Sequence, residues 1–224
     1  SVAIYIISLV DAKDRRDFLA AQAKDIGFTP LWHTAVSGRS ISDADHLRLA
    51  FDWQRPLLKN EIACFFSHKN IWEKIASGNQ PSVILEDDVL LSPDFMLTVN
   101  SLVKFGHADI INLEAVGKKT LGREINFQNI NLCKLILNSS GAGAYLLWPD
   151  GAQILLNNFK KKGVGIVDAF INESRELRAW QLSSAICIQD CMFDYYNIPN
   201  GKKLNSIISR DNSIYPKPLN FRVA

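Results

Sequence analysis

The sequence lacks any apolar segment long enough to cross a membrane, since none of its hydrophobic runs approaches the roughly 18 residues that a spanning helix needs. An excess of either charge is also missing, because 25 basic and 23 acidic side chains leave a formal net charge of +2. This near-neutral balance argues against nucleic acid as the main partner. The N-terminus shows no basic segment or cleavage site of a secretion signal.

Cysteine is equally scarce, with four residues in a chain of 224. Cys64, Cys133, Cys187 and Cys191 are scattered and stand mostly among apolar neighbours, which is typical of reduced packing thiols in a cytoplasmic protein. The spacing of Cys187 and Cys191 would suit a zinc site. However, no second Cys/His pair with finger-like spacing accompanies them, so zinc is disfavoured.

The most informative stretch is an acidic motif that follows a short apolar run. Residues 83–85 have the pattern of a buried strand, and three consecutive carboxylates follow at 86–88. Carboxylates at the carboxyl end of a strand lie where open α/β sheets bind ligands. Neighbouring carboxylates repel by about 1 kcal/mol even in a water-like dielectric. A hard divalent cation would remove this repulsion, and an exposed acidic turn is the alternative.

The start of the chain predicts a βαβ unit. The apolar, β-branched run over 2–9 is typical of a strand buried on both faces. Asp11 offers a cap for a helix over 13–26, and Gly27 marks its end. A second strand is expected over 28–35, so the sheet should begin with parallel strands.

A largely buried helix is expected over 61–76, where apolar residues occupy most of the circumference. Cys64, His68, Ile71 and Ile75 share one face of this helix. His68 is therefore either a hydrogen-bonded histidine of the core or part of the wall of a ligand cleft.

The other expected elements complete an α/β pattern without internal repeat, low-complexity block or linker. Before the acidic motif we expect a loop or short helices over 37–58 and Asn60 as the cap of the next helix. After the motif we expect a helix start at Ser92–Pro93, a strand over 109–114, a hairpin or flap over 116–137 and a strand ending at Trp148. The last elements are a helix from Pro149 to Asn158, a helix from Asp168 to about Trp180, a strand over 181–190 and an irregular tail from Asn197.

Several stretches resemble, in this order, glycosyltransferase family 25, which comprises bacterial lipooligosaccharide galactosyltransferases and collagen-modifying relatives. The matching segments are 4–9 with Arg15–Arg16, 61–68 with Trp72–Glu73, 84–91, 111–114, 141–147 and 167–168. Glu-Asp-Asp alone is weak evidence, whereas the ordered set is strong. Asn60 departs from the pattern, since the family often carries Gly there, and so does Trp148–Pro149.

The resemblance implies a GT-A-type nucleotide-binding α/β fold, with a mostly parallel central sheet flanked by helices. We expect a single domain over 1–224, with a donor-binding half at about 1–115 and an acceptor-side half at about 116–224. The implied activity is inverting, metal-dependent transfer of a hexose, above all galactose from UDP-galactose, onto a lipooligosaccharide or related surface glycan. Such a bacterial β-galactosyltransferase would work in the cytoplasm, with peripheral contact to the inner membrane left open.

The resemblance also assigns roles to the acidic motif and its neighbours. Asp88 is the expected ligand of Mn²⁺ or Mg²⁺, Glu86 a second ligand or a ribose contact, and Asp87 a contact of the UDP-sugar. A metal beside the leaving UDP would act as a Lewis acid, and Arg15 or Arg16 would add a cationic donor to the diphosphate. The remaining residues expected to contact the donor are Ser8, Leu9, His68, Gly141, Ala142 and Gly143.

Inversion needs a base that takes the proton of the acceptor hydroxyl as this hydroxyl attacks the sugar. Asp168 and Glu114 are the candidates, because each is an acid at the end of a short apolar run. We prefer Asp168, which lies in the later half of the chain, where such folds usually bind the acceptor. The alternative for either acid is a helix cap or an ion pair.

Two other functions stay open from sequence alone. A nucleotidyltransferase or sugar-nucleotide hydrolase also uses acids at strand ends, but the first strand–helix turn lacks a Gly-rich, Lys-containing phosphate loop. A non-catalytic module that binds sugar or nucleotide is the third possibility. UDP binding without turnover or metal dependence would distinguish it from an enzyme.

Overall fold

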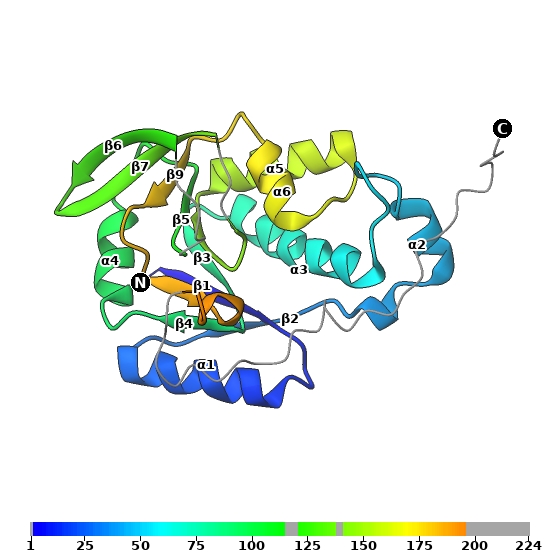
Figure 1. The fold of residues 1–224 in the computed structure, drawn as a ribbon, viewed down its shortest axis with the longest axis horizontal. Coiled ribbons are helices and arrows are strands. Elements are labelled where there is room, and N and C mark those ends of the chain that lie inside the picture. The colour runs from blue at the N-terminus through cyan, green and yellow to red at the C-terminus, as the bar shows by residue number, and fades with distance from the viewer. Residues whose placement is uncertain (1, 115–120, 138–140, 196–224) are drawn as a thin grey trace.

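The computed structural model describes residues 2–114, 121–137 and 141–195, and its main feature is an eight-stranded sheet with helices on both faces (Figure 1). The strands, in spatial order, are β2 (Leu31–Thr34), β1 (Ala3–Ser8), β3 (Ser82–Glu86), β8 (Ala144–Leu147), β5 (Ile110–Asn112), β9 (Ala179–Leu182), β7 (Ile130–Leu137) and β6 (Leu121–Phe127). Within the described residues, β8 and β7 run opposite to the other six strands. The predicted α/β fold with a mostly parallel, helix-flanked sheet is confirmed.

The first βαβ unit forms as the sequence predicts. Strands β1 and β2 are parallel, and α1 (Lys13–Ile26) connects them. The helix ends at Gly27, whose φ of 88° is the left-handed conformation that glycine adopts without a steric cost. The prediction that Asp11 caps this helix is wrong, because the N-cap is Ala12 and no side chain caps the helix there.

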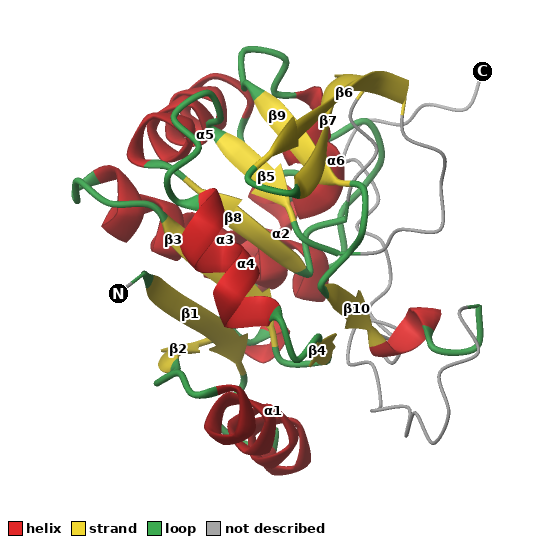
Figure 2. Cartoon of the chain, turned by 90° about the vertical axis from the view of Figure 1, so that its left-hand side faces the viewer, coloured by secondary structure: helices red, strands yellow, loops and turns green. Residues whose placement is uncertain are grey.

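Two hydrophobic cores lie on opposite faces of the sheet, because successive side chains of a strand point to opposite faces. Figure 2 shows the helices that lie on either side of the sheet. On β3, Ile84 packs into the core under α3 (Lys59–Ala76), α5 (Pro149–Lys162) and α6 (Val167–Glu173). Its neighbours Val83 and Leu85 pack into the core under α1 and α4 (Phe95–Leu102). Both faces of β3 are therefore buried up to the point where the acidic motif begins.

Helix α3 is as buried as its sequence indicates, and its core-facing residues include Phe65, His68 and Trp72. It begins earlier than predicted, with Leu58 as N-cap, so Asn60 lies inside the first turn and is not the cap. The backbone N–H of Leu58 donates to the carboxylate of Glu61 at 2.8 Å, which satisfies one donor of the helix start.

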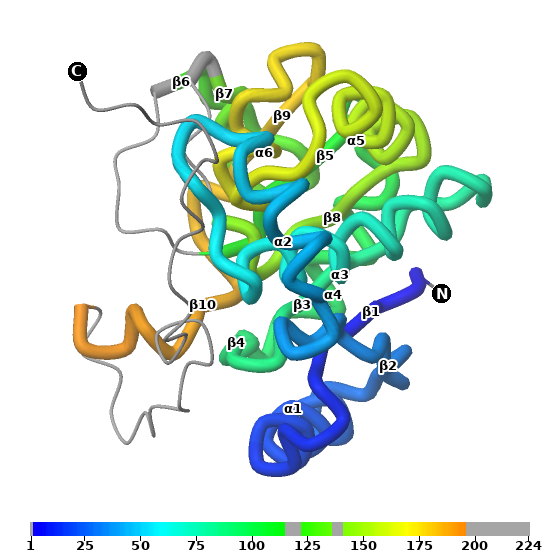
Figure 3. The backbone as a smooth tube through the Cα atoms, turned by 90° about the vertical axis from the view of Figure 1, so that its right-hand side faces the viewer, coloured from blue at the N-terminus to red at the C-terminus, as the bar shows by residue number. Residues whose placement is uncertain are grey.

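A small second sheet pairs β4 (Val89–Leu91) with β10 (Cys187–Gln189) in antiparallel register (Figure 3). The sequence did not predict β4, and the helix expected to start at Ser92–Pro93 begins only at Phe95. The strand expected over 181–190 is two separate strands, β9 and β10. This pairing places Gln189 opposite Val89, directly beside the acidic motif.

Other predicted boundaries also shift. The helix from Pro149 continues to Lys162 rather than ending at Asn158. Helix α6 ends at Glu173, so the prediction of a helix up to Trp180 is wrong, since Trp180 lies in β9.

The predicted hairpin and loop region are confirmed where the structure describes them. Strands β6 and β7 form an antiparallel hairpin with positive φ at its turn, and the segment after β2 carries a 3₁₀ turn, η1 (Gly38–Ser40), and the short helix α2 (Asp43–Leu49). Residues 116–120 and the predicted irregular tail from Asn197 lie outside the described residues. In the part of the chain that the structure describes, no helix combines the length and apolarity of a membrane span.

We predict that the aromatic cluster between α3 and α6 is a main source of stability. Phe65 is fully buried, with ring centroids 4.9 Å from Phe170, 5.6 Å from Trp72 and 5.7 Å from Phe159. Phe65→Ala should lower the free energy of unfolding by about 3–5 kcal/mol, measured by urea titration. Leu97→Ala, at a side chain that is 71% exposed, is the control and should change it by less than about 0.5 kcal/mol. Similar losses in both variants would contradict the prediction.

Candidate active site

A cavity of about 1240 Å³ opens at the carboxyl ends of β1, β2 and β3. Its walls are the segment 7–11 after β1, the segment 34–40 after β2, the N-terminal half of α3 and the acidic motif at 86–88. The volume exceeds that of typical sites for drug-sized ligands. The carboxyl edge of the parallel strands is also where open α/β sheets bind nucleotides.

The cavity gathers about half of the residues that the sequence marks as donor-binding or metal-binding. Those that line it are Ser8, Leu9, Arg15, Glu86, Asp87 and Asp88. The other donor-binding candidates, which do not line it, are Arg16, His68, Gly141, Ala142 and Gly143. The two candidate bases, Glu114 and Asp168, do not line it either. Arg16 instead lies over the ring of Trp32, at 4.5 Å from its centroid, and so faces β2 rather than the cavity.

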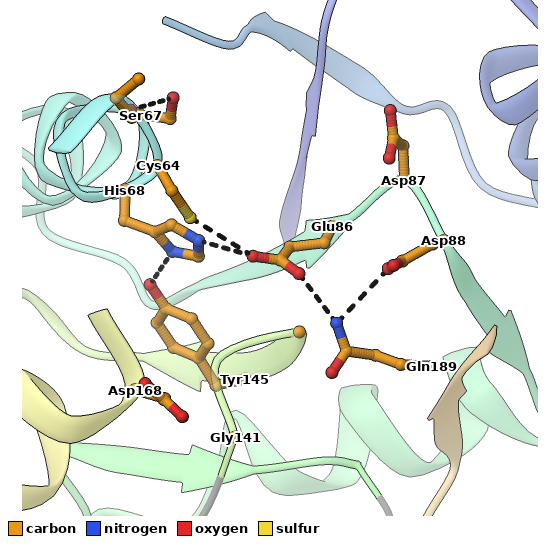
Figure 4. A network of polar contacts seen from close by, with 12 residues as sticks. Cys64, Ser67, His68, Glu86, Asp87, Asp88, Gly141, Tyr145, Asp168 and Gln189 are labelled. Carbon is orange, nitrogen blue, oxygen red and sulfur yellow. Dashed lines mark hydrogen bonds and ion pairs between the residues drawn. The ribbon is translucent and has the colours of Figure 1, made fainter. Parts of the chain in front are cut away.

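The three acids of the motif point in two directions (Figure 4). Asp87 turns away from its neighbours and accepts a hydrogen bond from Nη1 of Arg15 at 2.9 Å. Glu86 and Asp88 face each other across Gln189, whose Nε2 donates to Oε2 of Glu86 at 2.8 Å and to Oδ1 of Asp88 at 3.4 Å. One oxygen of each carboxylate therefore converges on a single point.

This convergence fits a hard divalent cation. A side-chain N–H group now lies between two carboxylate oxygens, and oxygens of this kind are the ligands that Mn²⁺ and Mg²⁺ take. Residues Glu86 and Asp88 would hold such an ion at the floor of the cavity, as the sequence predicts. Asp87 is bound to Arg15 instead, so it would orient this arginine rather than hold the metal.

Charge is unevenly compensated within the motif. Burial raises the pKa of Glu86, but the hydrogen bond from His68 and the charge of Arg15 outweigh burial, and the pKa is lowered overall. Burial, followed by the charge of Glu86, raises the pKa of Asp88 to about 7. Arg15 offsets this only in part, because its Nη1 is 4.0 Å from Oδ2 of Asp88. Asp88 is thus the carboxylate that gains most from a bound cation.

Three buried side chains are hydrogen-bonded in series to Glu86, on the side of this residue that faces away from Gln189. Nε2 of His68 lies 3.2 Å from Oε1 of Glu86, and Nδ1 of His68 lies 2.8 Å from the hydroxyl of Tyr145. Nε1 of Trp72 donates to the same hydroxyl at 2.9 Å. The sequence left His68 open between a core residue and a cleft wall. The structure makes it a fully buried residue that touches the site through Glu86.

Glu114 is enclosed behind the segment that carries the small residues 141–143. Glu114 is 2% exposed, and its carboxylate accepts the backbone N–H of Gly143 at 3.0 Å. A β-carbon at Gly141 would clash with this carboxylate, and one at Gly143 would clash with the side chain of Gln189. These glycines therefore let side chains approach the backbone. Burial, with the charge of Glu86 as the next cause, raises the pKa of Glu114 to about 8.

Asp168 lies in the first turn of α6 and is half-buried. Its Oδ1 accepts the backbone N–H of Ala169 at 2.8 Å. Its charge reaches the site, because after burial and Glu86 it is the next cause that raises the pKa of the Cys64 thiol. Asp168 thus lies near enough to Cys64 to affect its thiol, and it comes from a different segment than the acidic motif (Figure 4).

Sequence reasoning missed two residues that shape the site. Gln189 bridges Glu86 and Asp88, and the buried Asp190 donates its backbone N–H to the carbonyl of Asp88 at 3.0 Å. Both follow from the pairing of β10 with β4, which has no local sequence signal. Tyr145 was a different case, since it stands in the matching segment 141–147, and only its contact with His68 was unforeseen.

The chain is similar to known proteins over most of its length. A family model described as glycosyltransferase family 25 (LPS biosynthesis protein) matches residues 2–171. A glycosyltransferase 25 family member of Aedes aegypti is 31% identical over 173 residues, which are 70% of this chain and 27% of that protein. The human inactive glycosyltransferase 25 family member 3 is 27% identical, over 75% of this chain and 31% of that protein. Procollagen galactosyltransferase 1 of Danio rerio is 28% identical, over 45% of this chain and 18% of that protein.

The chain therefore spans less than a third of the length of these curated relatives. Among solved structures, a glycosyltransferase involved in the glycosylation of the major capsid of PBCV-1 has a TM-score of 0.47 at 10% identity, covering 84% of this chain and 94% of that one. S. aureus TarS has a TM-score of 0.48 at 11% identity, and the match covers 88% of this chain and 62% of that one.

We predict that Glu114 makes the stability of the metal-free protein depend on pH. Its pKa is about 8 in the folded protein against an ordinary 4.5. The folded chain therefore keeps a proton that the unfolded chain has lost, and stability should fall as pH rises through this range, by at most about 5 kcal/mol. Urea unfolding with EDTA at about pH 5 and pH 8 should show this slope.

Glu114→Gln should remove the larger part of this dependence, because the amide keeps the acceptor for Gly143 and cannot titrate. The part that remains comes from Asp88, whose pKa of about 7 acts in the same direction. Glu124→Gln, at an exposed glutamate of β6, should keep the slope of the unmodified protein. An unchanged slope in Glu114→Gln would show that Glu114 does not hold this proton.

Proposed function

We propose that this chain, which belongs to glycosyltransferase family 25, is an inverting, metal-dependent enzyme that transfers a hexose from a UDP-sugar to a glycan. The observation that carries the proposal is the convergence of Glu86 and Asp88 on one point in the floor of a nucleotide-sized cavity. Family membership gives the reaction class, glycosyl transfer. The donor, the metal and the acceptor are our proposals.

The donor would enter along the carboxyl ends of β1 and β2. Ser8 and Leu9, with the segment 34–40, line the part of the cavity next to these strands and would contact the uracil and ribose. The diphosphate would then lie over Glu86 and Asp88. Arg15, which lines the same cavity and pairs with Asp87, adds positive charge beside the phosphates. All residues that line the cavity fall within the expected donor half, about 1–115; the single domain and its division into halves stay predictions.

A divalent cation, Mn²⁺ or Mg²⁺, would supply Lewis-acid stabilisation of the charge that develops on the leaving UDP. The protein's own part is to hold two carboxylate oxygens at one point before the ligand arrives. Gln189 keeps them there, since its amide group bonds to both. Preorganisation of this kind reduces the reorganisation needed when the cation binds.

Asp168 is our proposed base. It comes from the acceptor-side half of the chain, is half-buried, and lies on a segment apart from the metal-binding acids. Glu114 remains the alternative, but its geometry disfavours it. Its carboxylate is enclosed behind Gly141 and Gly143, and its pKa of about 8 keeps it mostly protonated at neutral pH.

We propose galactose as the hexose and a lipooligosaccharide-type surface glycan as the acceptor. Two likenesses support this choice: the family is described as one of LPS biosynthesis proteins, and the Danio rerio relative is a procollagen galactosyltransferase. A bacterial enzyme of this type would work in the cytoplasm, at the inner face of the membrane that holds its acceptor.

A non-catalytic nucleotide- or sugar-binding module is the second candidate. The observation in its favour is that the human relative is named as inactive. The two candidates differ in a simple assay. An enzyme releases UDP from a UDP-hexose in the presence of acceptor and cation, whereas a module binds UDP without turnover.

We predict that Asp88→Asn abolishes metal-dependent transfer. Loss of one oxygen ligand and its charge should lower kcat/KM by at least about a hundredfold, since a Lewis-acid metal contributes several kcal/mol to the transition state. UDP release from UDP-galactose with Mn²⁺ is the measurement. Asp94→Asn, at an exposed acid of the same segment, should retain activity. Full activity in Asp88→Asn would remove Asp88 from the metal site.

We predict that Asp168→Asn binds UDP-galactose with unchanged affinity but turns over about 10²–10⁴-fold more slowly, because it cannot take the proton of the acceptor. Calorimetric titration with donor and single-turnover kinetics separate the two effects. Glu114→Gln should keep its turnover at neutral pH. If Glu114→Gln is dead and Asp168→Asn is active, the base is Glu114.

A further inference from the structure

Three side chains that contact neither cavity nor solvent form a continuous hydrogen-bonded chain to the acidic motif. Trp72, Tyr145 and His68 are fully buried, and their polar atoms lie 2.8–2.9 Å apart. This series of hydrogen bonds ends at Oε1 of Glu86, 3.2 Å from Nε2 of His68. Burying this many polar atoms is unfavourable unless each finds a partner. Each hydrogen bond in the series should therefore have a defined donor and acceptor.

The direction follows from what each group can donate. The indole Nε1–H of Trp72 can only donate, so the oxygen of Tyr145 is its acceptor. Among the described residues, Nδ1 of His68 is the acceptor within reach of the Tyr145 hydroxyl proton. With Nδ1 accepting, a neutral His68 carries its proton on Nε2 and donates it to Glu86.

The two oxygens of Glu86 therefore have different surroundings. Oε1 faces the helix, where it meets His68 and the thiol of Cys64 at 3.8 Å. Oε2 faces Gln189 and Asp88. A carboxylate held by one oxygen cannot rotate freely, so the other oxygen keeps a fixed direction toward Asp88 (Figure 4).

We propose that Trp72, Tyr145 and His68 are a positioning relay, which binds Oε1 of Glu86 and thereby aims Oε2 at the cation and donor diphosphate. This inference rests on the proposed function for its ligand. His68 and Tyr145 are positioning residues, since they act through Glu86 and touch no substrate. Such partners of metal ligands typically change metal affinity about 10–100-fold when they are removed.

The same residues allow a competing assignment. Potential ligand atoms of Cys64, His68 and Glu86 lie within 4.8 Å of one another, and the Cys/His/carboxylate set would suit Zn²⁺. A metal on His68 needs Nε2 without its proton. The relay places a proton on that nitrogen, so we assign the three side chains to hydrogen bonding. Zinc becomes an outcome of the test.

The first experiment reads the His68 tautomer in the full chain labelled with ¹⁵N-histidine. The relay predicts that long-range ¹H–¹⁵N spectra show His68 protonated at Nε2 and unprotonated at Nδ1. The spectrum of the His68→Gln variant, which lacks the His68 signals, identifies these signals among those of the four histidines. In Tyr145→Phe the Nδ1 resonance should shift, because its donor is lost. A proton on Nδ1, or an Nε2 signal that moves on addition of stoichiometric Zn²⁺, would overturn the relay.

The second experiment tests whether the relay acts through Glu86. Calorimetric Mn²⁺ affinity in the presence of UDP should fall about tenfold in Tyr145→Phe. Ser174→Ala is the matched control, since it also removes a buried hydroxyl with two partners, Asn158 and the carbonyl of Phe170. This control should lose stability to a similar degree and keep its Mn²⁺ affinity.

A double-mutant cycle completes the test. In a Glu86→Gln background, Tyr145→Phe should cause no further loss of Mn²⁺ affinity, because the group on which it acts has changed. Equal losses in both backgrounds would overturn the relay. If the unmodified protein binds neither Mn²⁺ nor UDP, the proposed function fails, and the tautomer measurement alone decides the relay.

Discussion

Burial of carboxylate charge at the carboxyl end of β3 is the constraint on which the rest of this structure depends. Both faces of β3 are covered by hydrophobic cores, so the acids that follow it begin in a low-dielectric environment. Each acid meets a different partner: Asp87 meets Arg15, Glu86 meets His68, and Asp88 keeps the least compensated charge. This imbalance is what a divalent cation would correct.

The partners of these acids come from elements that are far apart in sequence, and the fold brings them together at the acidic motif. Helix α1 supplies Arg15, α3 supplies His68, and β10 supplies Gln189. The residue just before β8 also holds the motif, since the backbone N–H of Glu86 donates to the carbonyl of Gly143 at 2.8 Å. The donor cavity and the buried relay thus meet at one carboxylate, that of Glu86, which contacts each of them with a different oxygen.

The sequence predicts those parts of the site that local pattern determines. The apolar run before 86–88, the βαβ unit and the buried helix at 61–76 depend on periodicity and turn residues, and they form almost as expected. Gln189 could not be predicted, because its place follows from pairing between two three-residue strands distant in sequence. The helix start at Asp168 was also predictable from the apolar run before it, and Asp168 lies in the first turn of α6. The end of this helix at Glu173 was not predictable, because the following residues join β9 through pairing with the distant strand β5.

The central claim is that a divalent cation binds between Glu86 and Asp88 and holds a sugar diphosphate in the cavity. Anomalous diffraction from crystals of the full chain grown with Mn²⁺ and UDP tests it most directly. The account predicts a manganese peak bonded to oxygens of Glu86 and Asp88 and to both phosphates of UDP. A peak at Cys64 and His68 instead, or UDP bound in the cavity without any metal, would contradict it.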